Sequence, residues 1–165
     1  LESVYGYEIP LAMREELGYT VKGYSDNLQK ELQNDEVLNI FCNEYINIDS
    51  PIRLNDYQFS KNKNGYNVIL EVQNGGVIRR LSGNGNGMLD SVSNAIKHGL
   101  GYHYVLTDYK EHAKEKGSNS LAISYVSIKI DDKDIWGVGE DEDIASSSIK
   151  ALLSAINRHF KEIKL

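Results

Sequence analysis

The pattern of hydrophobic and polar residues predicts a helical first part of the chain. Up to about residue 47, hydrophobic residues recur three or four positions apart, as they do along one side of an α-helix. Pro10 is suited to open a first helix, and Asn34 or Asp35 is suited to cap a second one. Because two short helices make a poor core by themselves, we expect them to dock on another part of the protein.

The helical pattern is interrupted at Asp49-Ser50-Pro51, and from Arg53 onward hydrophobic and polar residues alternate as they do in β-strands. We therefore predict two parts, a helical linker subdomain at residues 1–49 and a second domain at residues 50–165.

In the first half of the second domain the alternation predicts three strands. A short strand spans Asp56–Ser60, and a half-buried strand spans Tyr66–Gln73. The pair Asn74-Gly75 favours a tight type I′ hairpin turn, and the third strand begins at Val77. We expect this strand to end near Leu81 in a glycine-rich loop.

The glycine-rich loop precedes a helix. Gly83, Gly85 and Gly87 alternate with small polar residues, so few side chains shield the backbone. From Met88 onward hydrophobic residues follow the spacing of an amphipathic helix. Exposed N–H groups at a helix start attract a negative group, so the sequence suggests a ligand site here. A strand-to-helix turn without a ligand is the alternative.

The second half of this domain repeats the same order of elements. The strongest predicted strand, Ser120–Ile130, changes the parity of its hydrophobic residues, which indicates a bulge or burial of both faces. Asp141 and Asp143 suit the first turn of the last helix, electrostatically and as caps. The other predicted elements are a strand within Gly101–His112, a less regular stretch at Thr107–Lys116, a charged turn at Asp131–Asp134, a strand at Ile135–Val138 and a final helix to about Lys164.

The two halves share one plan: strands, a G-x-G segment with an acidic residue nearby, and a helix containing alanine. We interpret this as an internal duplication of a β-β-β-α unit. The predicted fold class is α+β, with antiparallel sheets, two helices between or against them, pseudo-twofold symmetry and the N-terminal helical subdomain. Such symmetry brings the two helix starts toward a shared axis, where a pocket or a dimer contact can form.

Charge and composition narrow the function classes. The net charge of −6 and the pI of about 5.2 argue against nucleic-acid binding. No hydrophobic run is long enough to span a membrane, no secretory signal is present, and the single cysteine, Cys42, suits a reducing compartment. We therefore expect a cytoplasmic protein. Because the chain begins with Leu1 rather than Met, we also expect it to be a piece of a longer protein.

The sequence offers little support for catalysis. The glycine segment lacks the Lys-Ser or Lys-Thr of a phosphate-binding loop, and its flanking strands do not suit a dinucleotide fold. The four histidines lack metal-ligand spacing, and His112 is interpreted as solvated or capping rather than as an acid–base group. The cluster Glu140–Asp143 lacks the spacing of a calcium loop. We predict no catalytic residue, no metal and no cofactor in this chain.

Three spaced motifs resemble the C-terminal regulatory domain of 2-isopropylmalate synthase. They are Gly83–Asp90 (GNGNGMLD), Val105–Lys114 (VLTDYKEHAK) and Ile135–Arg158 (IWGVGEDEDIASSSIKALLSAINR). The first forty-odd residues are similar to the small helical subdomain that precedes this domain in the family, with YEIPLAM at Tyr7–Met13 and FCNEY at Phe41–Tyr45.

The resemblance implies a leucine-binding, dimeric allosteric module that inhibits an enzyme of leucine biosynthesis. In that family the parent enzyme condenses acetyl-CoA with 2-oxoisovalerate on a barrel that binds a divalent metal, and the barrel would precede residue 1. Asp90 stands where the family often has a small residue, so it could engage the effector amine or disfavour a carboxylate. By motif position, the effector-binding residues would be Gly85, Asn86, Gly87, Leu89, Asp90, Leu106, Tyr109, Ala113, Ser120 and Ile144.

Three alternatives stay open at this point. The chain could be the matching isoleucine-binding domain of citramalate synthase, because one methylene group in an apolar slot discriminates by only about 1–3 kcal/mol. It could be a structural dimerisation module that has lost ligand binding. A free-standing enzyme is the third reading, and the absence of a metal or nucleophile motif weighs against it.

Overall fold

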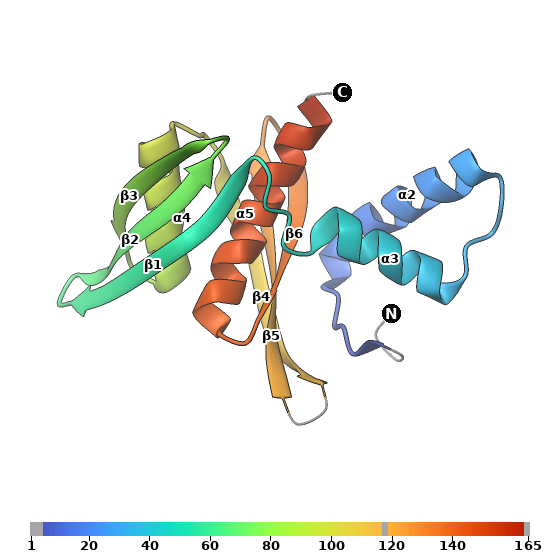
Figure 1. Ribbon diagram of the computed structural model, residues 1–165, viewed down its shortest axis with the longest axis horizontal. Helices are drawn as coiled ribbons and strands as arrows, with labels where there is room; N and C mark the ends of the chain where they lie inside the picture. Colours follow the sequence, from blue (N-terminus) through green and yellow to red (C-terminus); the bar gives the residue numbers. More distant parts are fainter. Residues whose placement is uncertain (1–4, 117–118, 164–165) are drawn as a thin grey trace.

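The computed structural model describes residues 5–116 and 119–163, and in these residues two N-terminal helices are followed by two β-β-β-α units (Figure 1). Each unit forms its own antiparallel sheet with the strands in sequence order, β1-β2-β3 and β4-β5-β6. The predicted α+β class and the duplication are therefore confirmed. The elements are α2 (Leu11–Leu28), α3 (Asn34–Tyr45), β1 (Ile52–Asn62), β2 (Gly65–Asn74), β3 (Val77–Gly85), α4 (Met88–Leu100), β4 (Val105–Lys116), β5 (Asn119–Ile130), β6 (Lys133–Asp141) and α5 (Ile144–Ile163).

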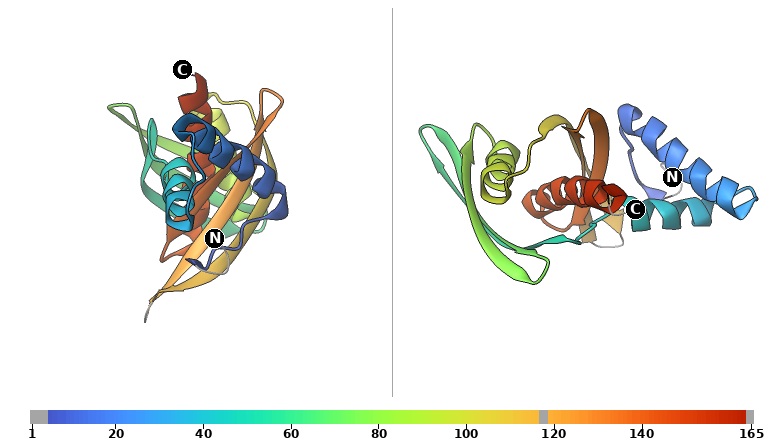
Figure 2. Two further views of the ribbon diagram at one scale, coloured as in Figure 1. Left: turned by 90° about the vertical axis from the view of Figure 1, so that its right-hand side faces the viewer. Right: turned by 90° about the horizontal axis from the view of Figure 1, so that it is seen from above.

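Helices α4 and α5 form a layer between the two sheets (Figure 2, right). Helix α4 packs on β3 and β2, and α5 packs on β6 and β5 while also reaching β1. One main core joins both sheets to both helices, with Leu70 and Ile128 from the sheets and Ile96 and Leu152 from the helices all fully buried. Burial of apolar surface on both sides of the helical layer is the main stabilising term.

The alternating glycines let each helix lie directly on the strand before it. A Cβ atom on Gly83 would come within 2.5 Å of the Ser91 carbonyl oxygen, and one on Gly137 within 2.3 Å of the Ala151 carbonyl oxygen. One on Gly139 would lie only 1.8 Å from the carbonyl oxygen of Ser147. Only glycine fits at such contacts, because the helix backbone occupies the place of a side chain.

The predicted glycine loop is therefore mostly strand, which corrects the sequence-based interpretation. Strand β3 continues through Gly83 to Gly85, and only Asn86 and Gly87 connect it to α4. The glycines at 83 and 85 serve helix packing, so their backbone does not form an open anion-binding loop.

Two hairpin turns differ in detail from the predictions. Asn74 still pairs with Val77 at the end of the β2–β3 ladder, so the two-residue loop is Gly75-Gly76 rather than Asn74-Gly75. Only Gly75 has a positive φ there, whereas a type I′ turn needs two such residues. Both Asp131 and Asp132 have positive φ, so the type I′ pattern occurs in the β5–β6 hairpin instead.

Strand β5 is buried on both faces, which explains its change of hydrophobic parity. Tyr125 and Val126 point to opposite faces, and both are fully buried. The register between β5 and β6 is continuous, and the irregularity lies in β4 between Leu106 and Asp108. The stretch Thr107–Lys116, predicted to be less regular, belongs to β4 and pairs with β5 without interruption from Asp108 to Lys116.

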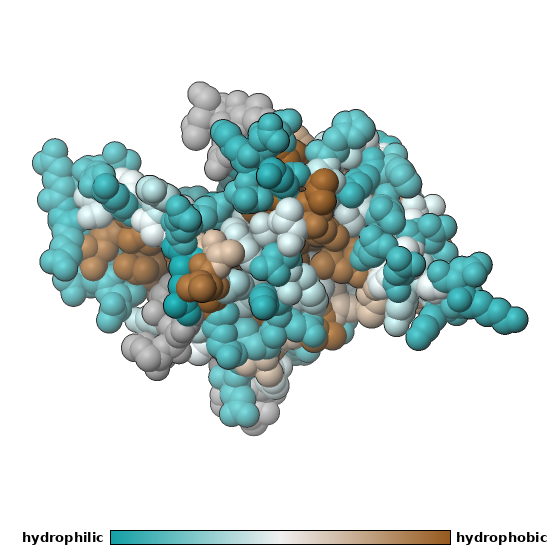
Figure 3. Space-filling model, turned by 180° about the vertical axis from the view of Figure 1, so that it is seen from behind, coloured by the Kyte–Doolittle hydropathy of each residue, from teal (hydrophilic) through white to brown (hydrophobic). Residues whose placement is uncertain are grey.

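The N-terminal helices dock on the second face of the β4–β5–β6 sheet, opposite α5. Tyr7, Phe41 and Tyr45 from the N-terminal part form a second core with Tyr125 and Trp136 of the sheet. The expectation that this helical part packs on another part of the protein is confirmed. Figure 3 shows hydrophobic surface over these helices. Leu11, Tyr19 and Leu28 of α2 are among the large side chains that are exposed.

The start of α3 differs slightly from the prediction. Its cap residue is Gln33, whereas Asn34, one of the two predicted caps, is the first residue of the helix. The Gln33 backbone N–H donates to Glu36 Oε1 at 3.1 Å, which forms the reciprocal pattern of a capping box.

An ion pair between the buried Arg158 and the half-buried Glu16 fixes α5 to α2. Arg158 Nη1 donates to Glu16 Oε2 at 3.2 Å and to the Trp136 carbonyl oxygen at 2.6 Å, and its guanidinium carbon lies 3.8 Å from the Tyr45 ring centre. Burial raises the pKa of Glu16, and the charge of Arg158 only partly opposes this effect. Burial also raises the pKa of Tyr45 to about 12.

His112 has a docking role, which corrects its interpretation as a solvated or capping residue. Its Nε2 atom lies 2.8 Å from the Tyr125 hydroxyl, and its Nδ1 atom lies 2.9 Å from Glu8 Oε2. The Glu8 backbone N–H also donates to Nε2 at 3.2 Å. The ring thus holds the N-terminal segment against β5.

We predict that Gly137→Ala lowers the free energy of unfolding by about 3 kcal/mol or more, because its new methyl group must displace helix backbone. Gly23→Ala is the matched control, because Gly23 is an exposed helical glycine with nothing within 4 Å of its added Cβ. It should raise stability by about 0.5–1 kcal/mol. Urea unfolding of both variants measures the difference, and equal midpoints would contradict the close-packing argument.

We predict that Glu16→Ala destabilises the protein by about 2–3 kcal/mol, because Arg158 keeps its buried charge without a carboxylate partner. The control is Glu15→Ala, which removes the same charge from an exposed position on the same helix and should change stability by less than about 0.5 kcal/mol. Thermal unfolding followed by circular dichroism provides the measurement.

Candidate functional site

A cavity of about 450 Å³ lies where the starts of α4 and α5 approach each other between the two sheets. Its volume falls within the range of small-molecule sites, about 300–1,000 Å³. Its lining is mainly apolar and comes from both β-β-β-α units. The lining residues are Phe59, Tyr66, Gly87, Met88, Leu89, Asp90, Val92, Tyr109, Glu111, Ile144, Ala145, Ser148 and Ile149.

The start of α4 carries its own carboxylate. Asp90 Oδ2 accepts the backbone N–H of Asn86 at 3.0 Å. The same oxygen would lie 2.4 Å from a Cβ atom on Gly85, so Gly85 leaves room for this carboxylate. Asp90 therefore ties the connecting segment to the first turn of α4, where a negative charge is also favourable to the helix dipole.

Two aspartates hold the start of α5, and they precede the helix instead of lying in its first turn. Asp143 Oδ1 accepts the Ala145 N–H at 3.3 Å, and Tyr57 from the first sheet donates its hydroxyl to the same carboxylate group. Asp141 Oδ2 accepts bonds from Lys150 Nζ at 2.6 Å and from the Ser146 hydroxyl at 2.9 Å. Burial alone would raise the pKa of Asp141, but the bonds from Lys150, from the Asp143 N–H and from Ser146 outweigh it and lower that pKa.

A chain of hydroxyl groups joins the cavity wall to α5. The Tyr109 hydroxyl donates to Glu111 and lies 2.8 Å from the Ser148 hydroxyl. Ser148 in turn lies 3.2 Å from the fully buried hydroxyl of Ser124, which lies 2.8 Å from that of Ser147. Burial, followed by the bond to Glu111, raises the pKa of Tyr109.

Half of the predicted effector-binding residues line this cavity. They are Gly87, Leu89, Asp90, Tyr109 and Ile144. The role of all ten residues in binding stays a prediction.

The other five predicted residues lie near the cavity or away from it. The Asn86 N–H donates to the Asp90 carboxylate, and Gly85 leaves room for that carboxylate. Leu106 packs against the main core. Ala113 and Ser120 are exposed on β4 and β5, and Ser120 pairs with Glu115 near the hairpin end of the sheet.

Several lining residues were not predicted as part of the site. Glu111 stands two positions after Tyr109 on the same face of β4, and Ser148 stands four positions after Ile144 on the same face of α5. Strand and helix periodicity could have identified both. Phe59 and Tyr66 come from the first sheet and join the site only through tertiary packing.

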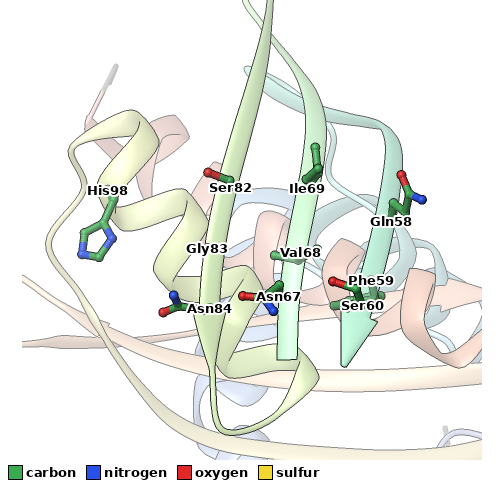
Figure 4. A pocket seen from close by; sticks show the side chains of 10 residues that line it. All are labelled: Gln58, Phe59, Ser60, Asn67, Val68, Ile69, Ser82, Gly83, Asn84 and His98. Carbon is green, nitrogen blue, oxygen red and sulfur yellow. The ribbon is translucent and has the colours of Figure 1, made fainter. Parts of the chain in front are cut away.

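A second cavity, of about 510 Å³, lies against the first sheet (Figure 4). Ser60, Asn67 and Asn84 form one cross-strand row, and Gln58, Ile69 and Ser82 form the next. None of the predicted effector-binding residues lines it, and it does not involve either helix start. We therefore take the cavity between the helix starts as the candidate site.

Within residues 5–116 and 119–163, no group of three or more His, Cys, Asp or Glu side chains is arranged to hold a metal ion. Of the helices in this part of the chain, none is both long and apolar enough to cross a membrane.

The fold and the cavity describe a duplicated α+β domain with a ligand-sized site between its two helix starts. A family model, the LeuA allosteric (dimerisation) domain, matches residues 31–160, and the chain belongs to this family.

Named relatives extend the similarity to nearly the whole chain. A 2-isopropylmalate synthase of Desulfitobacterium hafniense (strain Y51) is 45% identical over 163 residues, which cover 98% of this chain and 29% of the relative. That of Helicobacter hepaticus (strain ATCC 51449 / 3B1) is 40% identical over 162 residues, covering 93% of this chain and 29% of the relative. The chain thus spans less than a third of the length of these relatives.

We predict that Asp141→Asn lowers stability at pH 7 by about 1 kcal/mol, because the Lys150 bond loses its charged acceptor. The lowered pKa of Asp141 means that the native state favours the ionised form. Its contribution is therefore complete above the ordinary value of 3.8 and is lost as the pH falls through the lower folded-state pKa. The difference between variant and wild type should shrink below about pH 4.

Urea unfolding at pH 7 and pH 3 tests this dependence. Asp26→Asn, at an exposed position of α2, is the control and should give equal, small effects at both pH values. A variant difference at Asp141 that stays constant with pH would contradict the prediction.

Proposed function

We propose that this chain is the regulatory part of a 2-isopropylmalate synthase, and that it binds L-leucine in the cavity between the starts of α4 and α5. The observation that carries the proposal is the cavity itself, which is built from both β-β-β-α units and lined by five of the residues expected from the resemblance. The family description as an allosteric domain and the names of the relatives support it.

The cavity has the two kinds of surface that an aliphatic amino acid requires. Leu89, Val92 and Ile144 supply apolar contacts, and the polar groups are concentrated at Asp90, Tyr109 and Glu111. The first turn of a helix presents N–H groups without intrahelical partners, and such groups can receive a carboxylate.

We propose further that the chain forms a homodimer through the side on which the cavity opens. Apolar side chains around the cavity are partly exposed, with Met88 and Tyr109 each at 37% and Ile144 at 48%. A second copy covering them would bury this surface and enclose the ligand. The description of the family as a dimerisation domain supports this arrangement.

In the whole protein, leucine binding would inhibit a catalytic barrel that carries a divalent metal and condenses acetyl-CoA with 2-oxoisovalerate. Inhibition requires leucine to bind one arrangement of the protein more tightly than another. We also propose that the chain divides between residues 49 and 50 and that the protein is cytoplasmic.

We predict that isothermal titration of the chain with L-leucine gives saturable heat and that leucine raises the melting temperature. Ile144→Asp should abolish both effects, because it places a carboxylate in the apolar wall. Ile78→Asp is the matched control, because Ile78 is exposed on β3 and does not line the cavity.

Titrations with isoleucine and valine complete the experiment. Tighter binding of isoleucine would favour the citramalate synthase alternative. If sedimentation shows a dimer but none of the three amino acids gives heat or a thermal shift, the chain is a structural dimerisation module and the leucine proposal is wrong.

A further inference from the structure

The charged side chains that line the cavity between the helix starts are all acidic. Asp90 and Glu111 are the two carboxylates, and none of the described residues that line it is Lys, Arg or His. A ligand that carried only a carboxylate would meet two like charges and no cation there. An ammonium group would meet its natural partners.

The two carboxylates are not equivalent. Asp90 is committed to the start of α4, because its Oδ2 atom accepts the Asn86 N–H at 3.0 Å and stands over Gly85. Moving Asp90 toward a ligand would leave that N–H group without its acceptor.

Glu111 is free to receive a ligand. Its side chain is exposed, and its Oε2 atom accepts the Tyr109 hydroxyl. A carboxylate has about four acceptor positions on its two oxygens, so one bond from Tyr109 leaves capacity for an ammonium group. Because Tyr109 also contacts Ser148, Glu111 is held at the cavity wall rather than turned away from it.

The internal repeat gives the cavity a polar side and an apolar side. The segments Leu54–Phe59 (LNDYQF) and Leu106–Glu111 (LTDYKE) occupy equivalent places in the two units, and each contains a register shift after its leucine. Phe59 and Glu111 are therefore equivalent positions, and both line the cavity from different sheets. An amino acid with an aliphatic side chain matches this division, with its ammonium group toward Glu111.

We propose that the cavity recognises its ligand through the ammonium group, with the Glu111 carboxylate as the acceptor and Tyr109 as the residue that positions it. The proposal rests on the proposed function, since it specifies how the same cavity selects an amino acid. The same contact would let the cavity bind an amino acid in preference to the 2-oxo acid that has the same side chain.

Isothermal titration of the wild-type chain with three compounds tests the recognised group. L-Leucine and L-leucinamide both carry the ammonium group, so both should bind, with affinities within about tenfold of each other. The 2-oxo acid 4-methyl-2-oxopentanoate lacks that group and should bind at least about 10- to 100-fold more weakly, the loss expected for one charged hydrogen bond.

The substitution Glu111→Gln tests the assigned acceptor. It should weaken the binding of leucine about 10- to 100-fold, and it should reduce the preference for leucine over the oxo acid by a similar factor. Glu115→Gln removes the same charge from an exposed position on the same face of β4, outside the cavity, and should bind leucine like the wild type. Thermal melts of both variants verify that they are folded.

The outcomes separate this inference from the proposed function. If leucine does not bind the wild type at all, the proposed function fails. If leucine binds but the oxo acid binds equally well, recognition through the ammonium group is wrong. If the oxo acid is rejected but Glu111→Gln binds leucine normally, the acceptor is another group and the assignment to Glu111 is overturned.

Discussion

The fold depends on direct contact between helix backbone and strand backbone. Gly83 and Gly139 stand at equivalent places in the two sheets, and each lies under one helix with no room for a side chain. This contact fixes the height and the direction of α4 and α5 over their sheets. The meeting of the two helix starts, and therefore the place of the cavity, follows from it.

Helix α5 joins the candidate site to the N-terminal helices. Ser148 lies at the cavity, and Arg158, ten residues further along the same helix, binds Glu16 of α2. At about 1.5 Å per residue, the two contacts are about 15 Å apart along one rigid element. Between them Ser154 donates to the Tyr45 carbonyl oxygen, and Asn157 donates to that of Ile48. A displacement of α5 at the cavity therefore acts directly on the docked helical pair.

Much of the fold could be predicted from periodicity, because buried faces repeat every two residues in strands and every three or four in helices. The glycines misled the interpretation, because glycine at every second position suits a loop and also suits a strand covered closely by a helix. Strand β4 was underestimated from Thr107 onward, because exposed polar side chains such as Lys110 and Glu115 conceal its alternation.

The candidate site could be predicted only in part. Gly87 to Asp90 and Ile144 lie at helix starts, which the sequence indicates clearly. Tyr109 is predicted as a site residue from its position in the second of the three motifs. Phe59 and Tyr66 reach the cavity because two separate sheets enclose the helical layer. The local sequence around either residue does not indicate this contact, because the contact arises from packing between distant elements.

The duplicated helices differ in length, and this difference makes the two units unequal. Gly83 and Gly139 make the same close contact with Ala95 and Ala151, so α5 continues beyond Ile156, the residue that corresponds to Leu100 at the end of α4. Asn157 and Arg158 in this extension are buried against the N-terminal part. Ser154 is buried there as well, whereas His98, its counterpart in α4, is exposed. The candidate site draws residues from both copies of the duplicated unit, whereas the hydrogen bonds to Glu16 and Ile48 come from the longer helix of the second copy. A difference in helix length is therefore enough to tie one of two similar units to the N-terminal part of the chain.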